Sequence, residues 1–412
     1  MSFEIFVMRI LLINKFFYPH GGADVYFLNL GRLLQGAGHQ VAYFSQHHHG
    51  ESTNQWRPYF VDEVDFSGAR ASGGLAKALR FCYSFEAKKK LRQLLRDFQP
   101  EVIHLHNIYH HLTSAVLDVL KKYPAPKVMT LHDFKLICPN YKLFTQGEIC
   151  ERCFPRHYGQ AVIHRCVQDS RTASLVAALE MSWTKARQIY EKTIDCFIAP
   201  SNFLAQKILA WQTTVKRLEH LPNFVFLDDL TPEFMPGDYY LYFGRLSPEK
   251  GLANLLQAFS QLPREKLKIV GQGPLAPSLR EFIDTHDLRN IALLGFKQKD
   301  ELYPIIRASR AVIVPSLLPD IYPFSIIEAQ ALGKVVIASR RGGMPEMIKE
   351  GETGYLYNPQ DSRELKSKIV DLANHLFLLP EMGRRARARV EAENSPTHHL
   401  RALESLYRSL MQ

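Results

Sequence analysis

Asp320 and Glu328 are two carboxylates with seven residues between them, in a segment whose pattern predicts a strand, a loop and a helix. The apolar run 311–314 predicts a buried strand, and Ser325 occupies the expected N-cap of the helix, three residues before Glu328. Free N–H groups and the helix dipole attract anions at such a helix start, and carboxylates accept hydrogen bonds from hydroxyls. The segment therefore predicts a site for a ligand with phosphate and hydroxyl groups. An ordinary strand followed by a capped helix is the alternative interpretation.

Arg245 and Lys250 are candidate phosphate ligands because they share one loop, which Gly244 and Gly251 bound. The loop follows the apolar run 239–243, which predicts a strand. A guanidinium and an ammonium group in such a loop suit a diphosphate. The next two predicted strands end in glycine, aromatic or basic residues, namely Gly271, Gly273, Phe296 and Lys297. Because the carboxyl ends of parallel strands meet at one edge of a sheet, we expect all of these residues in one site.

Two glycines and a histidine also lie at or after the ends of predicted strands in the first half of the chain. Apolar runs predict strands at 9–14, 41–45, 102–106, 128–132 and 196–200. Gly21 and Gly22 open the first predicted helix, where they let the backbone approach a phosphate or a sugar closely. His132 ends the fourth predicted strand, a position at which doubly wound sheets bind ligands. A buried structural histidine is the alternative interpretation of His132.

The alternation of strands and helices occurs twice, which predicts an α/β chain with two doubly wound domains. A length of 412 residues allows an ample core in each domain. Prolines and Gly237 between 227 and 238 predict a linker. We therefore expect an N-terminal domain at 1–225 and a C-terminal domain at 226–396. Residues 397–412 predict a final helix that packs back on the N-terminal domain.

Composition favours a soluble globular protein with anionic ligands. Hydrophobic residues make up 46% and charged residues 22% of the chain, and no apolar run reaches the length of a membrane span. The first seven residues include Glu4 and do not resemble a signal peptide, so we expect a cytoplasmic protein. The net charge of +10 favours phosphorylated partners, and we expect no nucleic-acid partner.

The segment 77–96 carries seven basic residues and one acid, Glu86, among regularly spaced leucines. A basic amphipathic helix can lie on an anionic membrane surface, which would make the protein peripheral at the inner face of the membrane. A solvated helix face is the alternative interpretation.

Four cysteines cluster in an irregular stretch at about 136–168 that interrupts the first domain. They are Cys138, Cys150, Cys153 and Cys166. Four thiolates at this spacing predict a structural zinc site, although a second Cys-x2-Cys pair is missing. Reduced thiols in a packed loop and a redox-labile pair are the alternatives. A catalytic zinc is not expected, because four cysteines would leave no open coordination position.

Taken together, these motifs resemble the retaining glycosyltransferases of family 4, whose GT-B fold consists of two Rossmann-like domains facing across a cleft. The resemblance covers nearly the whole chain, and the acidic pair matches the family's Glu-x7-Glu motif. Besides that pair, it rests on Gly21-Gly22, His132, Gly244-Arg245, Lys250-Gly251 and Gly271-Gln272-Gly273-Pro274. The cysteine stretch resembles that of a subgroup with Leu-His-Asp before Cys-Pro-Asn. The chain departs from the family at Asp320, where Glu is usual, and at Tyr322-Pro323, where Phe-Gly is commoner.

The resemblance implies transfer of a sugar, with retention, from a UDP- or GDP-linked donor to a glycan or a lipid-linked acceptor, such as a cell-surface polysaccharide precursor. Arg245 and Lys250 would neutralise the departing nucleoside diphosphate without a catalytic metal. Glu328 would accept hydrogen bonds from the ribose, Asp320 would hold hydroxyls of the donor sugar, and His132 would face that sugar. The other implied donor-site residues are Gly21, Gly22, Gly244, Gly271, Gly273, Phe296, Lys297, Tyr322, Pro323, Phe324 and Ser325.

Two alternatives remain open from the sequence. A nucleotide-sugar epimerase of the same architecture would also hold carboxylates at the cleft. A non-catalytic protein that binds nucleotide-sugars would be compatible with the unusual Asp320.

Overall fold

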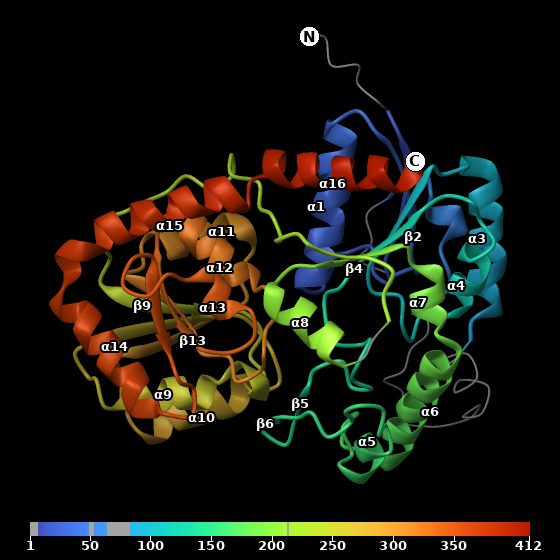
Figure 1. Ribbon diagram of the computed structural model, residues 1–412. Helices are drawn as coiled ribbons and strands as arrows, with labels where there is room; N and C mark the ends of the chain where they lie inside the picture. Colours follow the sequence, from blue (N-terminus) through green and yellow to red (C-terminus); the bar gives the residue numbers. More distant parts are fainter. Residues whose placement is uncertain (1–6, 49–52, 64–82, 212–213) are drawn as a thin grey trace.

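The computed structural model describes residues 7–48, 53–63, 83–211 and 214–412, which form two α/β domains (Figure 1). The N-terminal domain is built on a six-stranded parallel sheet in the order β2-β1-β3-β4-β7-β8. Its strands are β1 (Arg9–Ile13), β2 (Gln40–Phe44), β3 (Val102–Leu105), β4 (Lys127–Thr130), β7 (Cys196–Ala199) and β8 (Leu218–His220). Its helices are α1 (Gly22–Gly36), η1 (Arg57–Tyr59), α3 (Phe85–Phe98), α4 (Ala115–Leu120), α6 (Arg171–Arg187), α7 (Ile189–Thr193) and α8 (Asn202–Ala210).

The C-terminal domain repeats this architecture with the strand order β11-β10-β9-β12-β13-β14, again all parallel. Its strands are β9 (Tyr239–Phe243), β10 (Lys266–Val270), β11 (Ile291–Gly295), β12 (Ala311–Val314), β13 (Val335–Ser339) and β14 (Gly354–Tyr357). Its helices are η2 (Pro248–Lys250), α9 (Leu252–Ser260), α10 (Ala276–Thr285), α11 (Lys299–Arg307), α12 (Phe324–Ala331), α13 (Met344–Met347), α14 (Ser362–Asn374) and η3 (Leu376–Leu378).

The two Rossmann-like sheets confirm the predicted fold class. Central strands such as β3 and β12 are buried along their whole length, as expected for parallel strands that are covered on both faces. The edge strands β8 and β14 were not predicted from the sequence. β8 has three residues, and β14 begins at a glycine, so neither carries the apolar run that marks the central strands.

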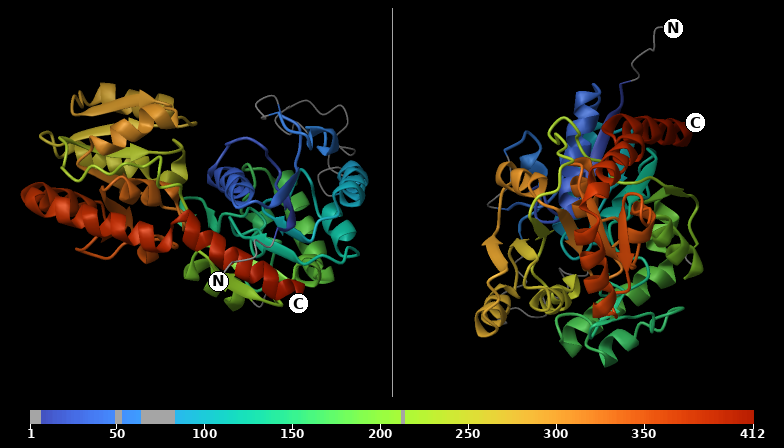
Figure 2. Two further views of the ribbon diagram at one scale, coloured as in Figure 1. Left: turned by 90° about the horizontal axis from the view of Figure 1, so that it is seen from above. Right: turned by 90° about the vertical axis from the view of Figure 1, so that its left-hand side faces the viewer.

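Two long helices end the chain and connect the domains. α15 (Leu379–Glu393) lies along the C-terminal domain, and α16 (Pro396–Met411) lies against the N-terminal domain (Figure 2). The buried Tyr407 hydroxyl of α16 lies 2.6 Å from His104 Nδ1 of β3. His399 accepts a hydrogen bond from the Tyr26 hydroxyl at 2.9 Å, because its other ring nitrogen donates to the Pro222 carbonyl. The end of the chain is therefore part of the N-terminal core.

The chain passes between the domains twice, and the two crossings are hydrogen-bonded to each other. Val225 N–H donates to the Asn394 carbonyl at 3.1 Å, and Asn394 Nδ2 donates to the Asn223 carbonyl at 2.7 Å. A further contact joins the domains where the Glu346 carboxylate accepts hydrogen bonds from Asn202 N–H at 2.7 Å and Phe203 N–H at 2.6 Å. That carboxylate lies at the start of α8, where a negative charge is favourable.

The cysteine stretch forms a small hairpin and a short helix, β5 (Phe144–Thr145), β6 (Glu148–Ile149) and α5 (Gln160–Ile163). The structural zinc predicted here is not supported, because no group of three or more His, Cys, Asp or Glu side chains within the described residues is arranged to hold a metal ion. Cys138 Sγ instead donates to Asn140 Oδ1 at 2.9 Å. Burial raises the pKa of Cys138 to about 11 and that of Cys153 to about 12. Reduced thiols in a packed loop and a redox-labile pair stay predictions for these cysteines.

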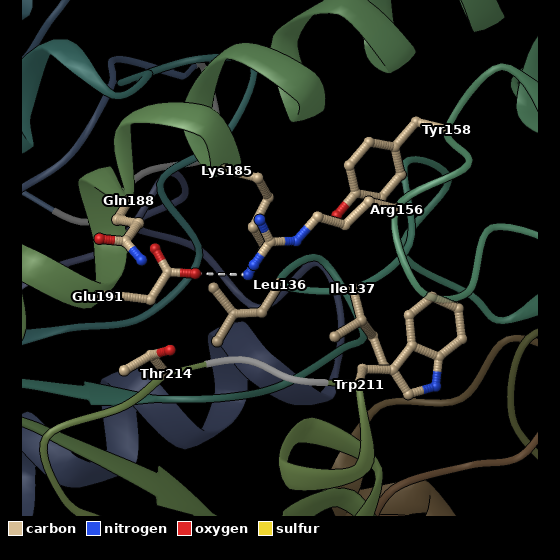
Figure 3. A pocket seen from close by; sticks show the side chains of 9 residues that line it. All are labelled: Leu136, Ile137, Arg156, Tyr158, Lys185, Gln188, Glu191, Trp211 and Thr214. Atoms are coloured by element: carbon tan, nitrogen blue, oxygen red, sulfur yellow. Dashed lines mark hydrogen bonds and ion pairs between the residues drawn. The ribbon is translucent and has the colours of Figure 1, made fainter.

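A buried ion pair closes the corner between α6 and α7 behind this stretch. Lys185 Nζ lies 2.6 Å from Glu191 Oε1, and the two side chains point toward one another beside a small cavity of about 10 Å³ (Figure 3). Burial lowers the pKa of Lys185, and Glu191 Oε2 has no hydrogen-bond partner in the described structure. The ion pair is thus enclosed, and each partner depends on the other for its charge.

Replacing Glu191 by glutamine is expected to lower the free energy of unfolding by about 3 kcal/mol, because the buried Lys185 ammonium would lose its counter-charge. Chemical denaturation measures this change. The matched control is Asp238→Asn, which removes the exposed partner of Lys266 and should have little effect. Equal effects of the two substitutions would contradict a stabilising role for the enclosed pair.

Candidate active site

A cavity of about 550 Å³ lies between the two domains and contains most of the predicted site residues. Its walls are the loop before α1 and the end of β4 on one side, and the ends of β9 and β12 with the start of α12 on the other. The predicted residues in its lining are Gly21, Gly22, His132, Gly244, Arg245, Lys250, Asp320, Tyr322, Pro323, Phe324, Ser325 and Glu328.

A second cavity of about 570 Å³ adjoins the first and shares His20, Phe243, Gly244 and Arg245 with it. Its other walls come from the ends of β10 and β11. The remaining predicted residues line it, namely Gly271, Gly273, Phe296 and Lys297. The two cavities together form one cleft, with Arg245 where they meet.

Close packing of two loops shapes the floor of the cleft. Gly271 has a φ of +146°, and a Cβ atom there would lie 1.9 Å from the Gly244 carbonyl oxygen. The loops after β9 and β10 can touch in this way only because residue 271 has no side chain. This contact places the Gly271–Gly273 loop directly beside the loop that carries Arg245.

Lys250 and Asp320 form an ion pair in the cleft wall. The Lys250 ammonium donates to both Asp320 oxygens at 2.8 Å, although 70 positions separate the two residues in the chain. The side chains are 27% and 14% exposed, so the pair is partly shielded from water but open to a ligand. The carboxylate therefore holds the ammonium group in place at the cavity, and a ligand that approaches one of them also meets the other.

The helix start beside this pair differs from the sequence-based prediction. Ser325 was expected as the N-cap, but α12 begins at Phe324 and its N-cap residue is Pro323, with no side-chain hydrogen bond. Proline at this position fixes φ and leaves the first turn without a side-chain acceptor. Ser325 instead lies within the first turn and lines the cavity. The helix start is consequently uncapped where it faces the cleft, which suits an anion.

Glu328 lies one turn further along α12, largely enclosed in the cleft wall. Burial raises the pKa of Glu328 to about 7, and the positive charge of Lys299 limits the shift. The Tyr303 hydroxyl lies 3.5 Å from Glu328 Oε1. Near neutral pH this carboxyl therefore changes between its protonated and ionised forms.

His132 faces these groups from the N-terminal domain. Its Nε2 atom lies 3.0 Å from His106 Nδ1, and its ring lies edge-on to Tyr26 at 5.1 Å. Burial lowers the pKa of His132 to about 3, so the ring is neutral at physiological pH. A neutral imidazole at this position can exchange hydrogen bonds with a ligand in the cleft without adding charge.

Two sequence models match the chain and divide it between the domains. Residues 20–229 match the model described as Glycosyltransferase Family 4, and residues 231–389 match the model described as Glycosyl transferases group 1. The chain belongs to glycosyltransferase family 4. It is therefore a transferase enzyme, and the epimerase and the non-catalytic binding protein are set aside.

Relatives of this glycosyltransferase include a protein of Klebsiella pneumoniae described as an uncharacterized 42.6 kDa protein in the cps region. It is 26% identical over 83% of this chain and 88% of its own length. The putative colanic acid biosynthesis glycosyltransferase WcaL of Escherichia coli is 27% identical over 40% of this chain and 44% of its own length.

Solved structures share the GT-B fold of this glycosyltransferase over nearly their whole length. Sucrose-phosphate synthase from Thermosynechococcus elongatus has a TM-score of 0.74 at 19% identity, over 98% of this chain and 99% of that one. Anabaena HepE in complex with UDP and glucose has a TM-score of 0.65 at 18% identity, over 97% and 99% of the two chains.

The structure also places in the cleft of this glycosyltransferase residues that sequence reasoning missed. His20 lines both cavities, and its pKa is lowered by burial and then by the charge of Arg245 across the cleft. The only feature of the sequence that could have indicated a role for His20 is its position next to Gly21. Lys299 lines the same cavity as Glu328. The sequence feature that could have revealed Lys299 is its position just after Phe296 and Lys297, at the start of α11.

The predicted basic segment is described only in part. Lys77 and Arg80 lie outside the described residues, whereas α3 contains the other basic residues of the segment. Lys90 forms an i,i+4 ion pair with Glu86 at 3.0 Å, and Lys88 lies 3.7 Å from Asp118. No helix in the described part of the chain is long and apolar enough to cross a membrane. Binding of α3 to an anionic membrane surface stays a prediction.

Proposed function

We propose that this glycosyltransferase moves a sugar from a UDP- or GDP-linked donor to a glycan or a lipid-linked acceptor, with retention of the anomeric configuration. The observation that carries the proposal is the convergence of Arg245, the Lys250–Asp320 pair and the uncapped start of α12 on one cavity. Two cations and a helix N-terminus form a site for a diphosphate, and two carboxylates supply acceptors for hydroxyls.

Each group has a role in the proposed reaction. Arg245 and Lys250 stabilise the negative charge that develops on the departing nucleoside diphosphate, as fixed charges do in other transfer reactions. Asp320 accepts hydrogen bonds from the donor sugar, and Glu328 accepts them from the ribose. The acceptor lies on the N-terminal side of the cleft, near Gly22, and attacks from the face that the diphosphate leaves.

The relatives support the choice of substrates. HepE was crystallised with UDP and glucose, and the name of WcaL refers to colanic acid biosynthesis. A nucleotide-sugar donor and a polysaccharide precursor as acceptor follow from these names as a proposal for this chain.

The test is incubation of the purified protein with a panel of UDP- and GDP-sugars, with and without extracted lipid-linked glycans. We expect release of nucleoside diphosphate with one donor, in an acceptor-dependent manner. Proton NMR of the product should show the anomeric configuration of the donor. An inverted product would contradict retention, and an epimerised donor formed without acceptor would contradict sugar transfer.

The raised pKa of Glu328 predicts a pH dependence of nucleotide binding. Below about 7 the carboxyl is protonated, whereas the ribose hydroxyls bind the ionised form better, so binding should lower this pKa. Affinity for UDP or GDP should thus rise between pH 6 and pH 8. If the bound nucleotide lowers the pKa of Glu328 by one unit, the affinity at alkaline pH is about tenfold higher than the affinity at acidic pH.

Isothermal titration calorimetry of wild-type protein and Glu328→Gln measures this dependence. The glutamine variant corrects for titration of the nucleotide phosphate itself, so the difference between the two profiles isolates Glu328. Parallel profiles would contradict contact between Glu328 and the ribose.

A further inference from the structure

Three stacked imidazoles reach the cleft from inside the N-terminal domain. The ring centroids of His104 and His106 are 4.6 Å apart with an interplanar angle of 18°, and those of His106 and His132 are 5.3 Å apart with an angle of 27°. His104 and His106 are fully buried, and His132 lines the cleft. The stack thus joins the core of the domain to a candidate site residue.

The surroundings of the stack hold the middle ring in place. Both nitrogens of His104 are engaged, by the Tyr407 hydroxyl at 2.6 Å and the Thr130 hydroxyl at 2.7 Å. Phe27 and Tyr26 meet the His106 ring edge-on at 5.4 and 5.6 Å. His106 therefore has a fixed ring orientation, and its hydrogen bond points to His132.

A single proton is shared in the hydrogen bond between His106 Nδ1 and His132 Nε2, which are 3.0 Å apart. Both rings are neutral, because burial lowers the pKa of His132 to about 3 and that of His106 well below its usual value. One ring must donate and the other must accept. The remaining nitrogen of His106, Nε2, is buried and has no partner among the described residues.

The unpartnered nitrogen decides which ring donates. If His132 donated, the proton of His106 would lie on Nε2, a buried N–H group without an acceptor, which folded proteins rarely contain. If His106 donates from Nδ1, its Nε2 atom carries only a lone pair, and His132 carries its own proton on Nδ1.

We propose that His106 is a positioning residue that holds His132 as the Nδ1–H tautomer, with a hydrogen-bond donor available to a sugar hydroxyl in the cleft. The sugar contact rests on the proposed function, but the hydrogen bond between the two histidines does not.

The direct test is NMR of ligand-free wild-type protein labelled with ¹⁵N in its histidine rings. Two-bond ¹H–¹⁵N spectra distinguish a protonated ring nitrogen from a bare one, and the His132 signals are identified by their loss in His132→Gln. We expect the His132 proton on Nδ1; a proton on Nε2 overturns the proposal. The measurement needs no substrate, so its result does not depend on whether the protein transfers sugar as proposed.

Kinetics of His106→Asn and His106→Leu test the consequence. An asparagine amide can donate from near the position of Nδ1, whereas leucine cannot. We expect kcat to be about tenfold lower in the leucine variant than in the asparagine variant, which is the effect of one hydrogen bond. Equal losses in the two variants overturn the positioning role.

The matched control is His104→Leu, which removes a ring from the same stack without touching the hydrogen bond to His132. It should lower the melting temperature and leave the His132 proton on Nδ1. A change of the His132 tautomer in this variant would show that the stack as a whole, and not His106, sets it.

Discussion

Arg245→Ala is expected to lower kcat/KM for sugar transfer by roughly 10²–10³-fold while the protein stays folded. Arg245 is an exposed side chain at the junction of the two cavities, so its removal disturbs no core packing. In the proposed reaction, the variant lacks a fixed positive charge beside the departing diphosphate. Lys250→Ala should cost at least as much, because it also leaves the Asp320 carboxylate without its partner at 2.8 Å.

Initial rates of nucleoside diphosphate release measure these effects, and thermal unfolding reports whether each variant is folded. Arg280→Ala is the matched control, because Arg280 is exposed on α10 of the same domain and lines neither cavity. Rates near that of the wild type in both Arg245→Ala and Lys250→Ala would contradict the assignment of the diphosphate site.

Asp320→Asn is expected to have the second largest effect, a loss of roughly 10²-fold in kcat. The amide has nearly the size of the carboxylate but no charge, so it can neither neutralise Lys250 nor accept strongly from sugar hydroxyls. The loss should be greater in kcat than in nucleotide affinity, because the variant keeps the contacts that we propose for the nucleotide with Arg245 and Glu328.

Asp320→Glu tests the one position at which the chain departs from the acidic motif. The charge is retained but lies one methylene further from the backbone. We expect partial activity and a changed preference among donors that differ in a single hydroxyl.

Asp284→Asn, exposed on α10, is the matched control for Asp320→Asn. Equal rates for Asp320→Asn and the wild type would rule out a role of the carboxylate in the reaction.

The sequence predicted the strands that bear the site because their apolar runs are continuous. Burial on both faces requires such runs in β9 and β12, and each is followed by charged or glycine residues at the sheet edge. The sequence could not predict the Lys250–Asp320 pair, because that contact depends on how the loops after β9 and β12 lie in space. The pattern also suggested Ser325 as a helix cap, but Pro323 starts the helix two residues earlier.

The imidazole stack shows a further limit of sequence patterns. His104 and His106 are two positions apart at the end of one strand, and this spacing places both side chains on the same face of the sheet. What the strand pattern does not show is the contact of these rings with His132 after β4 and with Tyr407 of α16. Both contacts join residues far apart in the chain, so neither is visible in the local pattern.

The two hydrogen-bonded crossings have a mechanical consequence. Asn223 and Val225 in one crossing are hydrogen-bonded to Asn394 in the other, so the two segments that join the domains lie side by side in one narrow region. A rotation of one domain relative to the other would bend the backbone in this region, which can therefore serve as a hinge. Opening would separate Glu346 from the start of α8 and draw Arg245 away from His20, while Lys250 and Asp320 travel together as one rigid unit.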